Sequence, residues 1–256
     1  EGLAVVAING KCSFIDKEGK EVIPLKYDEA ESFSEGLAAV KLNGKCSFID
    51  KEGKEVIPLK YDWAGSFSEG LAMVNLGRKC EDEQIITGGK YGFINKEGKE
   101  VIPLKYVDAC KFNEGLARVK LNGCGFINKE GNEIIPLKYD DAMAYFSEGL
   151  AMVKLNGKYG FINKEGKEVI PLKYDYTLFF EEGLATVVLN GKHGFINKEG
   201  KEITPIKYDD ALFLKEGLAL VVLNNKHGFI NKEGKEITPI KYDGALFFEE
   251  GLAVVA

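Results

Sequence analysis

The stretch EGLAMVKLNGKYGFINKEGKEVIPLKYDYTLFFE, residues 148–181, contains every pattern that decides the fold. Its opening word, Glu-Gly-Leu-Ala, recurs along the chain every 34 residues, apart from one interval of 45. Seven copies begin at residues 1, 35, 69, 114, 148, 182 and 216, and a partial eighth spans 250–256. Repetition at a fixed period is typical of stacked structural units, so we expect a single repeat domain over residues 1–256.

Each copy contains the signals of short antiparallel strands. Apolar residues alternate over 150–155, which predicts a strand with one buried face. Asn156-Gly157 favours a two-residue type I′ turn into a second strand over 158–163, and a turn over 163–166 ends on a glycine that every copy shares. The third segment, 167–174, contains a proline, so we expect an edge strand, a bulge or a strand end there. For the stretch after residue 175 we expect irregular or short extended structure.

Two aromatic columns run through the copies. One consists of Phe14, Phe48, Phe93, Phe126, Phe161, Phe195 and Phe229, and the other of Tyr27, Tyr61, Tyr106, Tyr139, Tyr174, Tyr208 and Tyr242. Rings at equivalent positions allow each copy to bury its open face on the next, and a fully buried Phe contributes about 1.5–3 kcal/mol. We therefore interpret both columns as core. The alternative is that the Tyr column forms a binding surface for sugars or peptides.

The segment 157–171, Gly-Lys-Tyr-Gly-Phe-Ile-Asn-Lys-Glu-Gly-Lys-Glu-Val-Ile-Pro, resembles the WG (KWG) repeat family of bacterial proteins. The resemblance covers all seven copies. The tryptophan that names the family is absent, and its column holds Cys12, Cys46, Tyr91, Cys124, Tyr159, His193 and His227. The resemblance implies an interaction or structural module and no general enzymatic activity.

Two all-β architectures suit such an array. An open β-solenoid-like array stacks its units without closure, whereas a seven-bladed β-propeller-like ring closes on itself. Thirty-four residues are few for a propeller blade. The Glu-Gly-Leu-Ala motif occurs eight times, whereas a ring of seven blades requires only seven first strands. We therefore predict the open array and retain the ring as the alternative.

Composition excludes several classes of function. The net charge is −6, and Lys and Glu alternate within every copy, so no basic stripe for nucleic acid is present. No apolar run is long enough to span a membrane. Five cysteines without paired spacing favour a reducing, cytoplasmic compartment, while a surface or secreted location stays open.

The single long interruption follows Gly77, where the third copy exceeds the others by 11 residues. An excess at a hairpin tip projects from the scaffold, and such loops often carry specific contacts. The candidate interaction residues there are Arg78, Lys79, Glu81, Asp82 and Glu83. Further candidates are Arg118 and Met152, which belong to a variable column of the first strand that we expect to face outward. That column consists of Ala39, Met73, Arg118, Met152, Thr186 and Leu220.

The sequence offers no catalytic, cofactor or metal site. His193 and His227 share a column, but two ligands make a poor zinc site. We interpret Cys12 and Cys46 as thiols replacing an aromatic side chain rather than as a redox pair. The aspartates after the Tyr column are interpreted as caps of their own turns.

These patterns together predict a non-catalytic repeat scaffold, without a cofactor, that mediates protein–protein interaction or self-assembly through its repeat surface or its ends. The alternative is a carbohydrate or small-ligand binding module that uses the Tyr column and the long loop. A third hypothesis, a metal or redox enzyme, predicts bound metal in the purified protein.

Overall fold

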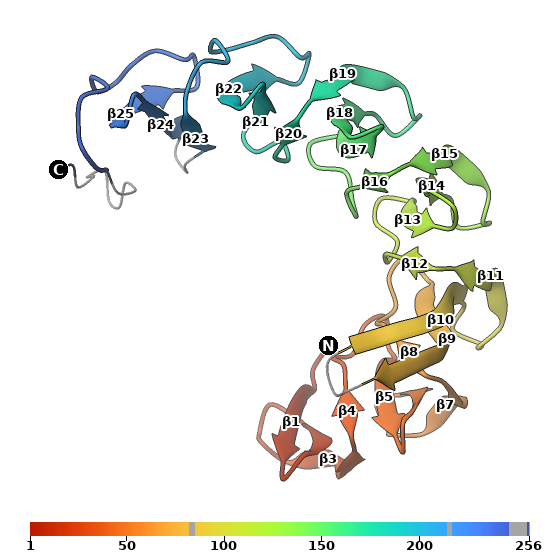
Figure 1. Cartoon of the computed structure of the whole chain (residues 1–256). Helices are drawn as coiled ribbons and strands as arrows, with labels where there is room; N and C mark the ends of the chain where they lie inside the picture. Colours follow the sequence, from red (N-terminus) through yellow and green to blue (C-terminus); the bar gives the residue numbers. More distant parts are fainter. Residues whose placement is uncertain (82–84, 214–216, 246–254, 256) are drawn as a thin grey trace. The chain divides into compact units, whose positions relative to one another are not determined.

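The computed structural model describes residues 1–81, 85–213, 217–245 and 255. No α-helix occurs in these ranges, and the strands form seven small antiparallel sheets in chain order (Figure 1). Sheet one contains β1 (Ala4–Ile8), β2 (Lys11–Ile15) and β3 (Glu21–Tyr27); sheet two contains β4 (Glu29–Ala30), β5 (Ala38–Leu42), β6 (Lys45–Ile49) and β7 (Glu55–Tyr61). Sheet three contains β8 (Trp63–Ala64), β9 (Ala72–Glu81), β10 (Ile85–Ile94) and β11 (Glu100–Tyr106); sheet four contains β12 (Asp108–Ala109), β13 (Ala117–Lys120), β14 (Cys124–Ile127) and β15 (Glu133–Tyr139).

The remaining sheets follow the same order. Sheet five contains β16 (Asp141–Ala142), β17 (Ala151–Leu155), β18 (Lys158–Ile162) and β19 (Glu168–Tyr174). Sheet six contains β20 (Tyr176–Thr177), β21 (Leu184–Leu189) and β22 (Lys192–Asn197); sheet seven contains β23 (Asp210–Phe213), β24 (Leu218–Leu223) and β25 (Lys226–Asn231). The three strands and two turns that the sequence predicts for the fifth copy are therefore confirmed to within one residue at each end.

The predicted turns have the required backbone conformations. Asn156 and Gly157 adopt φ values of 51° and 77°, as a type I′ turn demands, and Gly166 closes the next turn at 76°. The proline strand β19 lies at the edge of its sheet. Its pairing with β18 is shifted by a bulge, since Tyr159 faces Tyr174 while Phe161 faces Ile170. The expected edge position and bulge are both confirmed.

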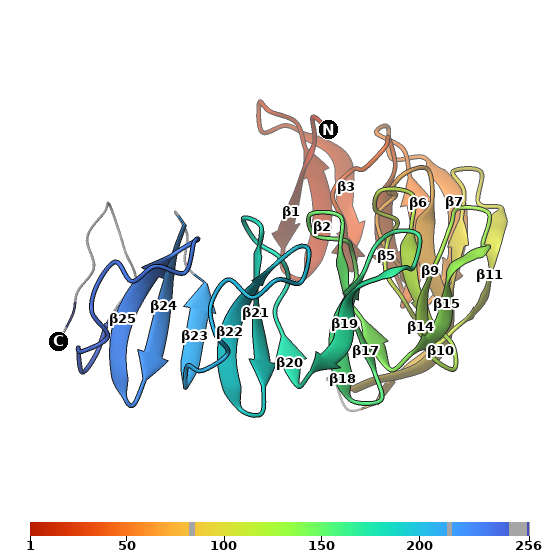
Figure 2. The same ribbon diagram turned by 90° about the horizontal axis from the view of Figure 1, so that it is seen from above.

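The short extended stretch after the proline strand is a strand of two residues in the first five copies, whereas β23 of the sixth copy has four. It does not join the sheet of its own copy. β20 pairs with β21 of the following copy through Tyr176 and Val188 and through Thr177 and Val187 (Figure 2). Each complete sheet therefore takes its first strand from one copy and its hairpin from the next, which joins neighbouring copies by backbone hydrogen bonds.

The Glu-Gly word itself forms a second type I′ turn, which the sequence patterns do not predict. Glu148 and Gly149 have φ values of 50° and 86°, and they connect Ser147 to Leu150 through a two-residue turn. The same positive φ occurs at Glu35, Glu69, Glu114 and Glu182. Glutamate is unusual in this left-handed conformation, because steric contact of the Cβ with the backbone destabilises it by about 1–2 kcal/mol relative to glycine.

The core lies between consecutive sheets rather than within any one of them. Phe161 of β18 packs edge-to-face on Phe180, which precedes β21, with ring centroids 4.7 Å apart. Both rings are buried, and they share a cluster with Ile170, Tyr174 and Val187. Equivalent pairs with centroids 4.9–5.0 Å apart join Phe14 to Phe33, Phe48 to Phe67 and Phe93 to Phe112. Each of these ring pairs lies within one copy. The predicted burial of a copy's aromatic column against the next copy is confirmed by the cluster, in which Phe161 packs with Val187.

The chain consists of two compact units, Glu1–Leu137 and Lys138–Ala256. A single domain, and the choice between an open array and a seven-bladed ring, stay predictions. The described residues contain no helix with the length and apolar character needed to cross a membrane.

Candidate functional site

Carboxylates connect each copy to the next at the Glu-Gly turns. The two oxygens of Glu148 each lie 3.1 Å from the backbone nitrogen of Gly183, and Oε2 lies 2.9 Å from Nζ of Lys198. Hydrogen bonding from Lys198, together with the Gly183 N–H, lowers the pKa of Glu148. The same arrangement links Glu1 to Gly36 and Lys51, Glu35 to Gly70 and Lys96, and Glu69 to Gly115 and Lys129. These carboxylates are structural connectors.

The aspartates after the Tyr column form a second set of connectors. Asp175 accepts hydrogen bonds from Nζ of Lys158 at 2.5 Å and from the backbone N–H of Asn190 at 2.6 Å. Both donors lower the pKa of Asp175, the lysine more strongly. Asn190 belongs to the Asn-Gly turn of the following copy. The prediction that these aspartates cap their own turns is therefore wrong: the side chain caps the next copy's hairpin, which lies 15 residues ahead.

The long interruption of the third copy is an extended hairpin rather than an irregular loop. β9 and β10 continue their pairing as far as Glu81 and Ile85, with Lys79 opposite Thr87. Asp82 and Glu83 lie outside the described residues. Arg78 is the candidate whose contacts are clearest, since its guanidinium carbon lies 5.9 Å from the centre of the Trp63 ring.

The variable column of the first strand does not face outward, which corrects the sequence expectation. Ala39, Thr186 and Leu220 are buried. Met152 packs against the core cluster that contains Phe161, and it is only half-buried. Both faces of β17 are covered, since Ala151 and Val153 are buried on one face and Met152 packs into the cluster on the other. A binding role for Met152 stays a prediction.

Arg118 is enclosed by polar groups of sheet four. Its guanidinium donates to Oδ2 of Asp108 at 2.6 Å, to Sγ of Cys110 at 3.3 Å and to Sγ of Cys124 at 3.6 Å. The side chain is only 12% exposed. Burial would lower the pKa of Arg118, but Asp108 and Cys110 together raise it, so the residue stays charged. Arg118 stabilises its own sheet, and its role as a partner contact stays a prediction.

Six of the seven members of the tyrosine column are buried and Tyr242 is half-buried, which contradicts the interpretation of the column as a ligand surface. The side chains of Tyr27, Tyr61, Tyr106, Tyr139, Tyr174 and Tyr208 are between 1% and 4% exposed. Burial is also the main cause that raises the pKa of Tyr61. Stacking of a sugar on these rings would require the sheets to separate.

The family's tryptophan column lies on the second strand of each hairpin and is filled by smaller or more polar side chains. Cys46 is buried, and burial raises the pKa of its thiol. Cys12, Cys46, Cys110 and Cys124 are free thiols. The Nδ1 atom of His193 lies 3.6 Å from Oδ1 of Asp210. Within the described ranges, no group of three His, Cys, Asp or Glu side chains is placed to hold a metal ion.

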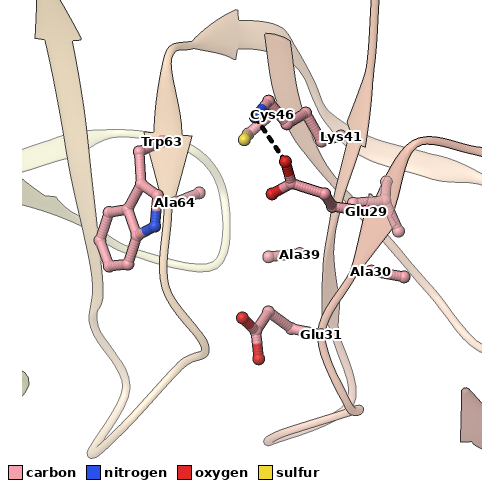
Figure 3. A pocket seen from close by; sticks show the side chains of 9 residues that line it. Glu29, Ala30, Glu31, Ala39, Lys41, Cys46, Trp63 and Ala64 are labelled. Carbon is pink, nitrogen blue, oxygen red and sulfur yellow. Dashed lines mark hydrogen bonds and ion pairs between the residues drawn. The ribbon is translucent and has the colours of Figure 1, made fainter. Parts of the chain in front are cut away.

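A small pocket opens between sheet two and the first strand of sheet three, a site that the sequence patterns did not indicate. Its volume is about 50 Å³. Figure 3 shows the Trp63 indole on one wall and the carboxylates of Glu29 and Glu31 on the other. Glu29 pairs with Nζ of Lys41 at 2.7 Å, and the thiol of Cys46 also lines the pocket. The position of the only tryptophan of the chain is the one sequence signal that pointed here.

The proline strands carry a row of exposed apolar side chains in the first unit. Val22, Val56, Val101 and Ile134 occupy the same position of β3, β7, β11 and β15, and they are 36–42% exposed. Two residues further along each strand lies a proline that is also exposed. We call these four residues the outer row. An isolated exposed valine is ordinary, but one at the same position of four successive sheets forms a periodic apolar surface.

Comparison with known proteins supports the sequence-based resemblance. The family model of the WG containing repeat matches residues 13–46, 47–80, 91–123, 125–159, 159–192, 194–226 and 228–256. No curated protein sequence matches the chain.

Among solved structures, the chain is similar to one described as the crystal structure of the eukaryotic initiation factor. The identity is 12% and the TM-score 0.52, over 98% of this chain and 77% of the other. Hsv2p of Kluyveromyces lactis is similar at 9% identity and a TM-score of 0.44, over 90% of this chain and 89% of that one. The first similarity concerns the fold alone, and the structural neighbours are β-propeller-like proteins.

Proposed function

The chain belongs to the family of WG-containing repeats, and from this premise we propose that it is a non-catalytic scaffold whose first unit binds a protein partner through the outer row. The observation that carries the proposal is the recurrence of an exposed β-branched residue on β3, β7, β11 and β15. A side chain that serves only its own sheet has no reason to stay apolar and exposed in four successive copies.

The chemistry of the outer strands indicates how a partner would bind. Each strand is the edge of its sheet, and an exposed edge normally invites pairing with another strand. A proline within the strand removes one backbone donor, and the bulge shifts the register, so strand addition is disfavoured. The outer row would therefore bind apolar side chains of a folded protein rather than an extended peptide.

The connectors support the scaffold role because they keep the copies at a fixed spacing. Several Glu-Gly turns are joined to the preceding copy by a carboxylate, as Gly115 is joined to Glu69, and several Asn-Gly turns by an aspartate, as Asn190 is joined to Asp175. A periodic surface gives a partner several weak contacts at once only if its spacing does not vary. The carbohydrate-binding alternative is disfavoured, because the tyrosines that would stack on a sugar are buried, as Tyr61 and Tyr174 are.

The proposal is tested by converting members of the row to threonine, which is polar and also β-branched. The triple variant Val56→Thr, Val101→Thr and Ile134→Thr retains β-branched side chains, so the strands should persist. Partners captured by the whole chain are identified by mass spectrometry, and the affinity of the purified partner is then measured for each variant. We expect the triple variant to bind at least about tenfold more weakly, since three apolar contacts of about 0.5–1 kcal/mol each are lost.

The matched control is Val107→Thr, because Val107 is 44% exposed but lies outside the outer row. It should bind like the parent protein. Equal affinity of the parent and the triple variant, with both folded by circular dichroism, would refute the proposal. A triple variant that loses only self-association in sedimentation velocity, and no heterologous partner, would show that the surface serves assembly between copies instead.

A further inference from the structure

We infer that the pocket between sheets two and three binds a guanidinium or alkylammonium group, presented by an arginine or lysine side chain of a protein partner. The inference rests on the proposed function, since it assigns a specific anchoring contact to the same scaffold. The pocket is lined by Trp63 from β8 and by Glu29 and Glu31 from sheet two (Figure 3).

The first argument is the combination of an aromatic wall with acidic groups. The face of an indole carries negative charge density and attracts cations, with a gain of about 0.5–2 kcal/mol that grows as water is excluded. The Trp63 ring already attracts one cation of this chain, the guanidinium of Arg78 at 5.9 Å. Opposite the ring, Glu31 supplies a carboxylate that can form a bidentate pair with a guanidinium.

The second argument is the balance of charge and size. Among the lining residues, Glu29 is neutralised by Lys41 at 2.7 Å, so Glu31 contributes one net negative charge; Arg78, beside the Trp63 ring, is not part of the lining. A volume of about 50 Å³ accommodates one or two water molecules or the end of one basic side chain, but no larger organic ligand. A cationic group carried by a protein fits both conditions.

The third argument is that the pocket depends on residues that other copies lack. In the sequence, the position of Glu31 is occupied elsewhere by Gly65, Cys110, Met143, Leu178, Leu212 and Leu246, and the position of Trp63 by Glu29, Asp108, Asp141, Tyr176, Asp210 and Gly244. Gly65 is itself part of the arrangement, because a Cβ at that residue would lie 2.9 Å from Cη2 of Trp63. Only in this pair of copies do a carboxylate, an indole and a glycine beneath the indole occur together.

The chain provides its own reporter, since Trp63 is its only tryptophan. The full chain is titrated with N-acetylarginine amide while tryptophan emission is recorded, and the neutral isostere N-acetylcitrulline amide serves as the control ligand. We expect a saturable change with arginine, with half-saturation on the order of 1–10 mM for this single contact, and none with citrulline. Equal responses to the two ligands, or no saturable response to arginine, would overturn the inference.

Variants locate the binding to the pocket. Glu31→Gln should weaken arginine binding at least about threefold, whereas Glu52→Gln removes the same charge from an exposed turn and should leave it unchanged. Gly65→Ala retains the reporter but displaces the ring, so it should weaken binding as well, and its unfolding midpoint shows whether the fold persists. If Glu31→Gln and Glu52→Gln behave alike, the inference is wrong. If Glu31→Gln loses arginine binding but captures the partner normally, the pocket is not the partner's anchoring contact, and the proposal for the outer row is unaffected. If instead the triple threonine variant captures the partner normally while Glu31→Gln does not, the proposal for the outer row alone is refuted.

Discussion

Replacing Glu148 by glutamine should measure how strongly the Glu-Gly connectors hold consecutive copies together. The carboxylate accepts the Gly183 N–H at 3.1 Å and pairs with Lys198 at 2.9 Å, and its side chain is 28% exposed. A charge-assisted hydrogen bond is worth about 1.5–3 kcal/mol, roughly twice a neutral one, so an amide that still accepts the N–H loses about 1 kcal/mol. Loss of the largely exposed ion pair adds about 0–1 kcal/mol.

We therefore expect Glu148→Gln to lower the free energy of unfolding by about 1–2 kcal/mol, which corresponds to a fall in Tm of about 3–8 °C. Calorimetry or circular dichroism during heating gives the measurement. Glu165→Gln is the matched control, because Glu165 lies exposed in a turn of the same copy and its loss changes the net charge equally. A control variant that melts as early as Glu148→Gln would refute the connector interpretation.

The pH dependence gives a second test of the same residue. The folded-state pKa of Glu148 lies below its ordinary value of 4.5, so the unfolded chain binds a proton more readily than the folded one. The stabilisation is therefore present above pH 4.5 and is lost as the pH falls through the folded-state pKa. The difference in Tm between the parent and Glu148→Gln should shrink as the pH is lowered below about 4.5. A difference that is constant from neutral to acid pH would show that the charge is not responsible.

Three further substitutions test other parts of the copy. Asp175→Asn should cost about 1 kcal/mol in urea unfolding, because the link to the following Asn-Gly turn loses its charge; no change in the midpoint would contradict this. Phe161→Ala should cost about 3–5 kcal/mol, since its ring is 1% exposed and packs on Phe180, and a cost below about 1 kcal/mol would argue against a core between the sheets. Gly160→Ala should cost about 1–3 kcal/mol, because the new Cβ would lie 2.6 Å from the carbonyl oxygen of Ile170, and unchanged stability would show that the sheet adjusts freely.

The strands and most turns could be predicted because their signals are local. Alternation over 150–155, the Asn156-Gly157 pair and the glycine at 166 each determine a conformation within a few residues. The Glu-Gly turn was missed because glutamate is disfavoured at positive φ. The conformational cost at Glu148 is offset by the hydrogen bond that its carboxylate accepts from the N–H of Gly183, 35 residues away. No local sequence pattern contains that contact.

The prediction that one face of the first strand points outward was wrong for a related reason. Alternation separates the two faces of a strand but does not say that either face meets water, and the inference of an outward face assumes a sheet with one free side. In β17, Ala151 and Val153 are buried on one face, while Met152 packs into a cluster on the other. The exposed apolar row lies instead on the proline strands, at residues such as Val56 and Val101.

Residues that differ from their equivalents in the other copies are informative about specific contacts. A position shared by all copies is explained by the sheet it builds, as Gly166 is by its turn and Tyr174 by its burial, so a consensus residue says little about partners. Glu31, Trp63 and Gly65 differ from their counterparts and yet surround one pocket. Independent drift would scatter such changes over the surface, whereas a requirement for one cationic contact would gather them where they touch. The scaffold and its specificity thus involve separate residues, and a variant at Glu31 should alter which partner binds without altering how the copies stack.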